Sequence, residues 1–240
     1  MKYNLCIDIG NTNIKAGVFH GDTLLENIQG EDSIAATMSR YDIQSCIVSS
    51  VRKNIPAAIE KIKGKVKRFI MLDANSPLPI KINYKTPETL GKDRVAAAVG
   101  AYKLFPGKNV IIVDAGTCIT YDFLDKDGVF QGGNIAPGIH MRAKAMHEFT
   151  SVLPEVEIKE NRDILGKSTT EALQNGALLG TFWEISAFIQ EIKDKYGDSL
   201  TIFTGGDAKY FVNKIKKPIF ANSNLVLIGL NEILNRYDKD

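Results

Sequence analysis

The sequence predicts an α/β fold of two similar lobes, each a mixed sheet with flanking helices. One observation is an internal duplication: an apolar strand-like run, then Asp-x-Gly with a nearby Thr, then a second strand-like run, occurs at Asp8 and again at Asp114. A second observation is that hairpins alternate with helical patterns along the chain, which is typical of α/β proteins. We place the lobes at residues 1–107 and 108–240. Two such hairpins facing each other would form a nucleotide cleft.

Length and composition are those of an ordinary soluble globular protein. The 240 residues are 44% hydrophobic and 24% charged, which allows a sizeable core. The net charge of +2, from 30 basic and 28 acidic residues, is too small to favour nucleic acid or an anionic membrane as a partner. The N-terminal apolar run is interrupted by Asp8, and no segment approaches the roughly 18 apolar residues of a membrane span. We therefore expect a cytoplasmic protein.

Elements of the first lobe follow from apolar runs and helical spacings. The hairpin covers 5–9 and 14–19, and the run Cys46-Ile47-Val48 predicts a further strand. After it, Pro56 suits the first turn of a helix in which apolar residues recur at the helical period. The full order after the hairpin is a helix at 34–40, strand 45–51, the helix after Pro56, strand 69–72, a Pro-containing connection at 75–88 and an Ala-rich helix at 93–104.

The second lobe is predicted in the same way. Gly132-Gly133 interrupts a strand as a bulge or a close ligand approach would, and Gly176 and Gly180 permit close packing of a long helix. Asn224 is a plausible cap for the last helix. The order is strand 109–113, a hairpin at 119–124 and 129–135, a helix from Pro137-Gly138 to Met146, a helix at 169–192, strand 200–203, turn 204–207, a helix to about 215, strand 219–220 and the final helix.

The duplicated pattern has the chemistry of a phosphate site. A buried strand that runs into a Gly-containing turn brings backbone N–H groups close to a ligand. A hydroxyl and a carboxylate beside it suit phosphate and a hydrated metal. One copy is weak support, because short patterns arise by chance. Its recurrence, followed by Thr204-Gly205-Gly206-Asp207 after a later strand, favours a nucleotide site in which the glycines let the backbone approach a purine and its ribose.

Several motifs together resemble those of type III pantothenate kinases, within the superfamily of acetate kinase, sugar kinases, Hsp70 and actin. The resemblance covers nearly the whole chain and implies two ribonuclease H-like lobes. It also implies ATP-dependent phosphorylation of pantothenate, the first step of coenzyme A biosynthesis. The blocks that carry it are Asp8-Ile9-Gly10-Asn11-Thr12-Asn13, Gly91-Lys92-Asp93-Arg94, Asp114-Ala115-Gly116-Thr117, Gly132-Gly133-Asn134-Ile135-Ala136-Pro137-Gly138 and Thr204-Gly205-Gly206-Asp207.

The resemblance implies roles for residues in both copies of the duplicated pattern. Asp8 would hold hydrated Mg²⁺ that accompanies ATP, because this hard cation keeps several waters and binds few carboxylates. Asp114 matches the position of a monovalent cation, K⁺ or NH₄⁺, although a hydrogen-bonding carboxylate at a strand end is the simpler interpretation. The ATP-binding residues implied are Asp8, Ile9, Gly10, Asn11, Thr12, Asn13, Ile14, Lys15 and Thr117.

The acceptor site is implied by the block that lies between the two copies. Asp93 would be the general base that accepts the proton of the pantothenate hydroxyl; without the family it reads as a first-turn helix carboxylate. Arg94 offers a permanently charged fork for an anionic substrate, and its alternative is a surface arginine. The substrate-binding residues implied are Tyr84, Gly91, Lys92, Asp93, Arg94 and Thr169. Tyr84 has a loop anchor as its alternative role, and Thr169 a helix cap.

Two other functions fit the same motifs. A different small-molecule kinase of the superfamily would share the hairpins, and a non-catalytic regulator could keep the fold without activity. Lys92 and Cys118 depart from the residues common in the family, a small residue and Ala respectively. The resemblance further implies a homodimer, with pantothenate and ATP as the small-molecule partners.

Overall fold

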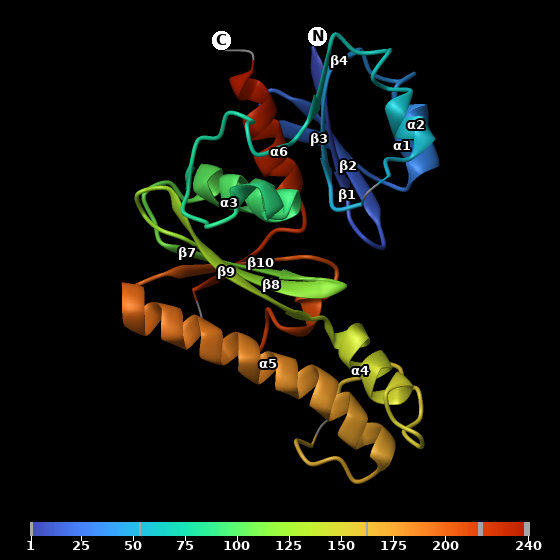
Figure 1. Ribbon diagram of the computed structural model, residues 1–240, viewed down its shortest axis with the longest axis vertical. Coiled ribbons are helices and arrows are strands. Elements are labelled where there is room, and N and C mark those ends of the chain that lie inside the picture. Colours follow the sequence, from blue (N-terminus) through green and yellow to red (C-terminus); the bar gives the residue numbers. More distant parts are fainter. Residues whose placement is uncertain (1, 53, 162, 216–217, 238–240) are drawn as a thin grey trace. The chain divides into compact units, whose positions relative to one another are not determined.

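Figure 1 shows the computed structural model of the chain, which describes residues 2–52, 54–161, 163–215 and 218–237. Packing divides the chain into two compact units. Unit 1 comprises Met1–Lys108, Leu124–Gly132 and Asn224–Asp240, and unit 2 comprises Asn109–Phe123 and Gly133–Ser223. The division differs from the predicted lobes, because the last helix and the segment 124–132 pack with the N-terminal part of the chain.

Unit 1 contains a five-stranded mixed sheet of order β3-β2-β1-β4-β5. Its strands are β1 (Tyr3–Ile9), β2 (Ile14–His20), β3 (Thr23–Gln29), β4 (Ile43–Ser50) and β5 (Arg68–Met71). β2 is antiparallel to both β1 and β3, whereas β1–β4 and β4–β5 are parallel. The edge strand β3 was not predicted. It follows a two-residue turn in which Gly21 has a φ of 58°.

The two faces of this sheet pack against different helices. Alternate residues of a strand point to opposite faces. Leu5, Ile7 and Ile9 of β1 join a core with residues of α1 (Glu31–Thr37) and α2 (Ala57–Glu60). On the other face, Asn4 donates hydrogen bonds to Asn231 and Asn235 of α6 (Leu225–Arg236). Asp8 shares the Asn4 face.

Helix α6 also packs closely against α3 (Lys92–Leu104), and both belong to unit 1 (Figure 1). Glycines make this approach possible. A Cβ atom at Gly229 would lie 1.8 Å from the carbonyl oxygen of Ala96, and one at Gly100 would lie 2.3 Å from that of Leu225. The last helix is therefore held in unit 1 by backbone-to-backbone packing.

The second sheet has the order β11-β10-β7-β8-β9-β6. Its strands are β6 (Lys81–Ile82), β7 (Val110–Ala115), β8 (Cys118–Leu124), β9 (Val129–Pro137), β10 (Leu200–Thr204) and β11 (Ile219–Ala221). β10 is parallel to β7 and to β11. The series β9-β8-β7-β10-β11 repeats the order β3-β2-β1-β4-β5, so the predicted α/β fold with two similar mixed sheets is confirmed.

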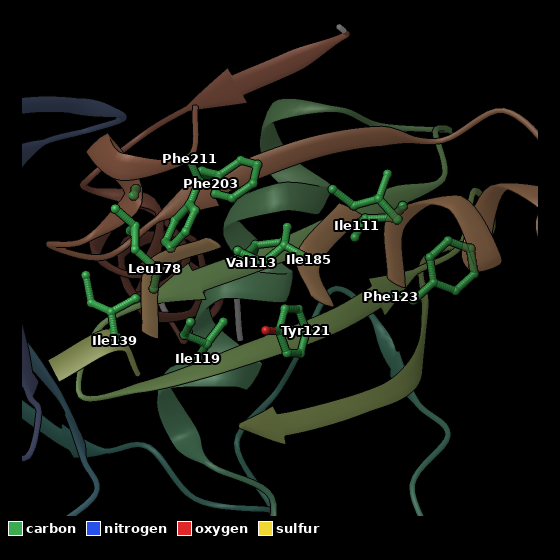
Figure 2. Packing of buried hydrophobic residues seen from close by; sticks show 13 residues of the cluster. Ile111, Val113, Ile119, Tyr121, Phe123, Ile139, Leu178, Ile185, Phe203 and Phe211 are labelled. Carbon is green, nitrogen blue, oxygen red and sulfur yellow. The ribbon is translucent and has the colours of Figure 1, made fainter. Parts of the chain in front are cut away.

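The core of unit 2 lies between its strands and α5 (Thr169–Tyr196) (Figure 2). Ile111 and Val113 of β7 contribute to it, as do Leu178 and Ile185 of α5. Tyr121, from β8, extends its hydroxyl to the edge of this core and donates to Glu184 Oε1 at 2.7 Å. The helix α4 (Ile139–Glu148) adds Ile139 to the core.

Other predicted helices are shorter or shifted. The first begins at Glu31 and the second is a single turn, Ala57–Glu60. The helix predicted from 207 to about 215 was wrong, because the described residues there form only the 3₁₀ turn η2 (Ala208–Tyr210). A further 3₁₀ turn, η1 (Pro87–Thr89), lies at the end of the Pro-containing connection. Across the described part of the chain, every helix is too short or too polar to span a membrane.

Candidate active site

The loop between β1 and β2 presents exposed backbone at the end of the first sheet. Asn11, Thr12 and Asn13 are exposed, and Ile14 and Lys15 begin β2. The Gly10 N–H donates to the Asn13 carbonyl at 3.0 Å, which closes the turn. The predicted phosphate-site residues 8–15 are thus continuous in unit 1, with an exposed turn at 11–13 between two paired strands, whereas Thr117 lies in unit 2.

Asp8 lies at the carboxyl end of β1 with a carboxylate oxygen that is buried. Among the described residues, its Oδ1 has no hydrogen-bond partner, and neither does the hydroxyl of Ser49, the residue opposite it on β4. Burial and the charge of Asp93 raise the pKa of Asp8 to about 6, and the charge of Lys15 opposes this effect. A buried, unsatisfied carboxylate oxygen is costly, so the site suits a cation ligand.

Asp93 stands in the first turn of α3, two residues after Gly91. Its Oδ1 accepts a hydrogen bond from the Arg94 N–H at 2.8 Å. A Cβ at Gly91 would lie 2.6 Å from the same oxygen, so glycine leaves room for this carboxylate. Lys92 instead reaches back to the Glu88 carbonyl at 3.3 Å. Asp8 and Asp93 both belong to unit 1, and the charge of Asp93 contributes to the raised pKa of Asp8.

Arg94 is buried and lies against two aromatic rings. Its Cζ is 5.9 Å from the centroid of the Tyr84 ring and 5.8 Å from that of Phe130. The pairing of β6 with β9 brings both rings to Arg94. The Asn83 N–H extends this pairing by donating to the Phe130 carbonyl at 2.9 Å. Arg94 is 5% exposed, so the surface-arginine alternative is wrong. Such stacking fixes a guanidinium group without neutralising it.

In unit 2, Asp114 meets the turn 204–207. Thr204 is paired with Asp114 across β10 and β7, and the Asp207 N–H donates to the Ala115 carbonyl at 2.9 Å. Gly205 has a φ of 87°, and a Cβ there would lie 2.5 Å from Asp114 Oδ1. The parallel pairing thus joins the two motifs, as strand ends of parallel strands meet at one edge of a sheet.

Two further motifs of unit 2 also meet. The Gly138 N–H donates to the Thr117 carbonyl at 3.1 Å, and a Cβ at Gly138 would lie 2.1 Å from the Gly116 carbonyl oxygen. At Gly133, a Cβ would lie 2.0 Å from the Tyr121 carbonyl oxygen. A bulge or a close ligand approach was predicted at Gly132-Gly133; at Gly133 the group that approaches closely is the neighbouring strand β8.

Beside this edge, His140 Nε2 lies 3.7 Å from Asp207 Oδ1. Burial raises the pKa of Asp207, while His140 and Lys209 oppose the rise. The pair joins the start of α4 to the 204–207 turn within unit 2.

Thr169 occupies the first position of α5 and is exposed. The helix cap is Ser168, whose hydroxyl accepts from the Glu171 N–H at 3.2 Å, so the alternative role of Thr169 as cap was wrong. Sequence reasoning missed Ser49 and Phe130 as neighbours of Asp8 and Arg94. The register of β1 with β4 and of β6 with β9 reveals them, and neither register is readable from one sequence.

Comparison with known proteins gives a consistent relationship over nearly the whole chain. A family model of type III pantothenate kinase matches residues 4–191. A type III pantothenate kinase from Bacteroides fragilis is 43% identical over 236 residues, which cover 97% of this chain and 97% of the relative. A type III pantothenate kinase from Flavobacterium psychrophilum is 38% identical over 242 residues, covering 98% and 99%.

Solved structures share the fold at lower identity. A conserved Baf family protein from Campylobacter jejuni superimposes with a TM-score of 0.64 at 22% identity, covering 98% of this chain and 100% of its own. The ROK hexokinase from Thermus thermophilus gives 0.52 at 12% identity, covering 98% and 99%. At these identities the likeness supports the two-sheet fold alone.

Proposed function

Because the chain belongs to the family of type III pantothenate kinases, we propose that it transfers the γ-phosphoryl group of ATP to the primary hydroxyl of pantothenate. The product is 4′-phosphopantothenate, and the reaction is the first step of coenzyme A biosynthesis. The observation that carries the proposal is the buried Asp8 oxygen without a described partner, in the same unit as Asp93, whose charge contributes to the raised pKa of Asp8.

Asp93 is the proposed general base. Its carboxylate would accept the proton of the pantothenate hydroxyl as that oxygen attacks the γ-phosphorus and the bond from this phosphorus to the β–γ bridging oxygen breaks. The Arg94 N–H holds one oxygen of Asp93, which fixes the direction of the other. Phosphoryl transfer depends mainly on positioning and charge neutralisation, so we assign the larger share of catalysis to the loop 9–15.

Asp8 is the proposed residue for Mg²⁺, through water. When bound with ATP, this cation neutralises charge on the β- and γ-phosphates. The fit lies in the buried Oδ1 of Asp8, which lacks a partner among the described residues. A nearby cation favours the charged carboxylate, and so would reverse the rise in its pKa.

Arg94 and Tyr84 are the proposed recognition residues for pantothenate, together with Gly91, Lys92 and Thr169. A guanidinium group that lies near two adjacent aromatic rings stays charged, which suits a carboxylate. Burial strengthens this attraction because the local dielectric constant is low. Lys92 adds a second positive charge in the same turn, although its ammonium group contacts the Glu88 carbonyl.

Asp114 and Thr117 are proposed to serve the nucleotide side of the reaction. Asp114 would bind K⁺ or NH₄⁺, and Thr117 would contact ATP. The support is the convergence of the strand end at Asp114 with the turn 204–207, where glycine leaves the carboxylate room. Carbonyl and carboxylate oxygens at one strand end are the ligands that such cations take.

A homodimer in the cytoplasm is the proposed assembly. The support is that, among the described residues, all large apolar side chains more than half exposed belong to unit 2. The most exposed are Phe149 at 85% and Val152 at 87%, with Trp183 of α5 at 56%. A Cβ added at Gly176 or Gly180 of α5 would meet no described residue within 4 Å, so the close packing predicted for these glycines is not made inside this chain.

Two alternatives make different predictions in the same assay. A superfamily kinase with another acceptor, such as a sugar or acetate, would release ADP with that acceptor in preference to pantothenate. A non-catalytic regulator would release none with any acceptor. Glucose represents the sugar acceptors in this assay.

The test measures ADP release in the presence of ATP, Mg²⁺ and either pantothenate, glucose or acetate. We expect turnover with pantothenate, and less when sodium replaces potassium. Asp93→Asn keeps the acceptor for the Arg94 N–H and is expected to fold, while turnover falls by roughly 10² to 10⁴-fold. Asp42→Asn, an exposed residue directly before β4, is the matched control and should behave as the wild type. Near-normal turnover of folded Asp93→Asn contradicts the assignment of the base.

A further inference from the structure

Arg52, in the segment that follows β4, binds the loop that joins β1 to β2. Its Nε donates to the Gly10 carbonyl at 2.7 Å, and its Nη2 donates to the Asn11 carbonyl at 3.1 Å. The preceding Val51 N–H donates to the Ile9 carbonyl at 3.1 Å. Three successive carbonyls, from residues 9 to 11, are therefore bound by two successive residues. The arginine side chain continues the parallel β1–β4 ladder beyond the end of both strands.

This arrangement decides where the N–H groups of the loop point. In a planar trans peptide, the carbonyl of one residue and the N–H of the next point in opposite directions. The carbonyls of Gly10 and Asn11 point to Arg52, so the N–H groups of Asn11 and Thr12 point away from it. Both residues are exposed. Successive N–H groups with one orientation form an anion-binding concavity.

Arg52 is itself held in place. The Ser50 hydroxyl accepts from the Arg52 N–H at 3.1 Å and donates to the Arg52 carbonyl at 3.2 Å. The side chain is half-buried, and the guanidinium fork can bind two adjacent carbonyls in a fixed geometry. A lysine ammonium has the same charge but no such planar fork. The charge also polarises both peptide groups, which strengthens their N–H groups as donors.

We propose that Arg52 is a positioning residue for the phosphate groups of ATP. It acts through the Gly10 and Asn11 carbonyls, which it fixes so that the Asn11 and Thr12 N–H groups face the phosphates. The inference rests on the proposed function, since that function places ATP at this loop. The phosphate site then includes a residue from outside the Asp-x-Gly pattern, because Arg52 lies in a different connection, after β4.

The test separates phosphate binding from adenosine binding. Binding of Mg-ATP, inorganic triphosphate and adenosine is followed by NMR titration of the ¹⁵N-labelled full chain, which resolves the amide signals of Asn11 and Thr12. In Arg52→Ala we expect affinity for ATP and triphosphate to fall by about 10- to 100-fold, as for loss of charged hydrogen bonds. Adenosine affinity should stay unchanged, and KM should rise for ATP but not for pantothenate.

Arg52→Lys and Arg40→Ala complete the design. Arg52→Lys keeps the charge and should still lose about 10-fold in triphosphate affinity, because one ammonium group cannot hold both carbonyls. Arg40→Ala is the matched control: Arg40 is an exposed arginine of the same unit, paired with Glu26 at 2.7 Å. It should bind all three ligands normally. Thermal unfolding is used to check that each variant is folded. If Arg52→Ala is unfolded, the triphosphate affinity of Arg52→Lys, compared with that of the wild type, tests the positioning role.

The outcomes distinguish this inference from the proposed function. Full triphosphate affinity in Arg52→Lys, or an equal loss for adenosine and triphosphate in Arg52→Ala, overturns the positioning role and leaves the kinase proposal intact. A second outcome is that both Arg52 variants bind ATP as expected while the wild-type protein releases no ADP with pantothenate. This outcome rejects pantothenate as the acceptor and leaves the positioning role of Arg52 intact. A wild-type protein that binds neither ATP nor triphosphate overturns both.

Discussion

At the scale of single residues, the charge of Asp8 lowers the stability of the folded protein at neutral pH. An ordinary aspartate is charged at neutral pH at little cost, but burial and the Asp93 charge raise the pKa of Asp8 from 3.8 to about 6. The folded state therefore binds this proton more tightly than the unfolded state. Stability contributed by the protonated form is present below about pH 4 and is lost as pH rises through 6. At neutral pH the folded protein bears the full cost of the charge.

Asp8→Asn should therefore stabilise the metal-free protein at neutral pH. A pKa rise of about two units corresponds to roughly 3 kcal/mol as an upper estimate. We expect the free energy of unfolding, measured with urea, to exceed that of the wild type at pH 7.5 and to approach it at pH 4.5. Pantothenate-dependent ADP release should fall in the same variant. A stability gain that is as large at pH 4.5 as at pH 7.5 would show that the charge is not its cause.

Sequence patterns identified the candidate carboxylates but not the residues that surround them. Asp8, Asp93 and Asp114 stand out because carboxylates interrupt apolar or Gly-rich patterns. Ser49 and Arg52 do not stand out, because a serine near the end of a strand and an arginine just after the strand are common. They gain meaning only from the register of β1 with β4, which sets two segments about forty residues apart side by side. Local patterns contain no information on that register.

At the scale of elements, strands were predicted better than short helices. The buried strands β4 and β7 contain apolar runs, at 46–48 and 110–113, which stand out in a sequence. The edge strand β3 is mostly exposed and lacks such a run. A helix to about residue 215 was predicted after the turn 204–207, but Tyr210 and Phe211 form i-to-i−3 hydrogen bonds typical of 3₁₀ turns. The fully buried Phe211 ring fixes that turn in the unit 2 core, a tertiary effect that periodicity does not report.

Gly229→Ala tests the packing of α6 on α3. Alanine favours an isolated helix by about 1 kcal/mol over glycine. Here the new Cβ would lie 1.8 Å from a backbone oxygen of α3, so the clash outweighs the gain and the helices must separate. We expect a net loss of about 2 kcal/mol or more in the free energy of unfolding. Gly64→Ala, in the same unit with nothing within 4 Å of its Cβ, is the control and should change it by less than about 0.5 kcal/mol. Equal effects of the two substitutions would contradict the close-packing interpretation.

At the scale of the whole molecule, the duplication predicted two similar mixed sheets, whereas the division into units differs from the predicted lobes. The boundary between the two Asp-x-Gly copies is visible in the sequence, and unit 1 indeed has a limit at Lys108. The return of 224–240 to unit 1 depends on Gly100 and Gly229 meeting across two helices far apart in the chain. Glycines within a helical pattern indicate that another segment of the chain packs closely against the helix, but they do not identify that segment.

The exposed apolar side chains of unit 2 give the prediction that concerns assembly. If Phe149 and Trp183 lie in a homodimer interface, a charge at either position must be buried without a partner, which opposes association. We expect the wild type to sediment at twice the mass of the chain, and the double variant Phe149→Glu with Trp183→Glu to sediment as a monomer. Leu25→Glu is the matched control, because Leu25 is 47% exposed on the edge strand β3 of unit 1 and should leave the dimer intact. Since the double variant removes no residue assigned to phosphate or to the base, its ATP binding should persist at the monomer mass. A double variant that remains dimeric at micromolar concentration would place the interface elsewhere on the chain.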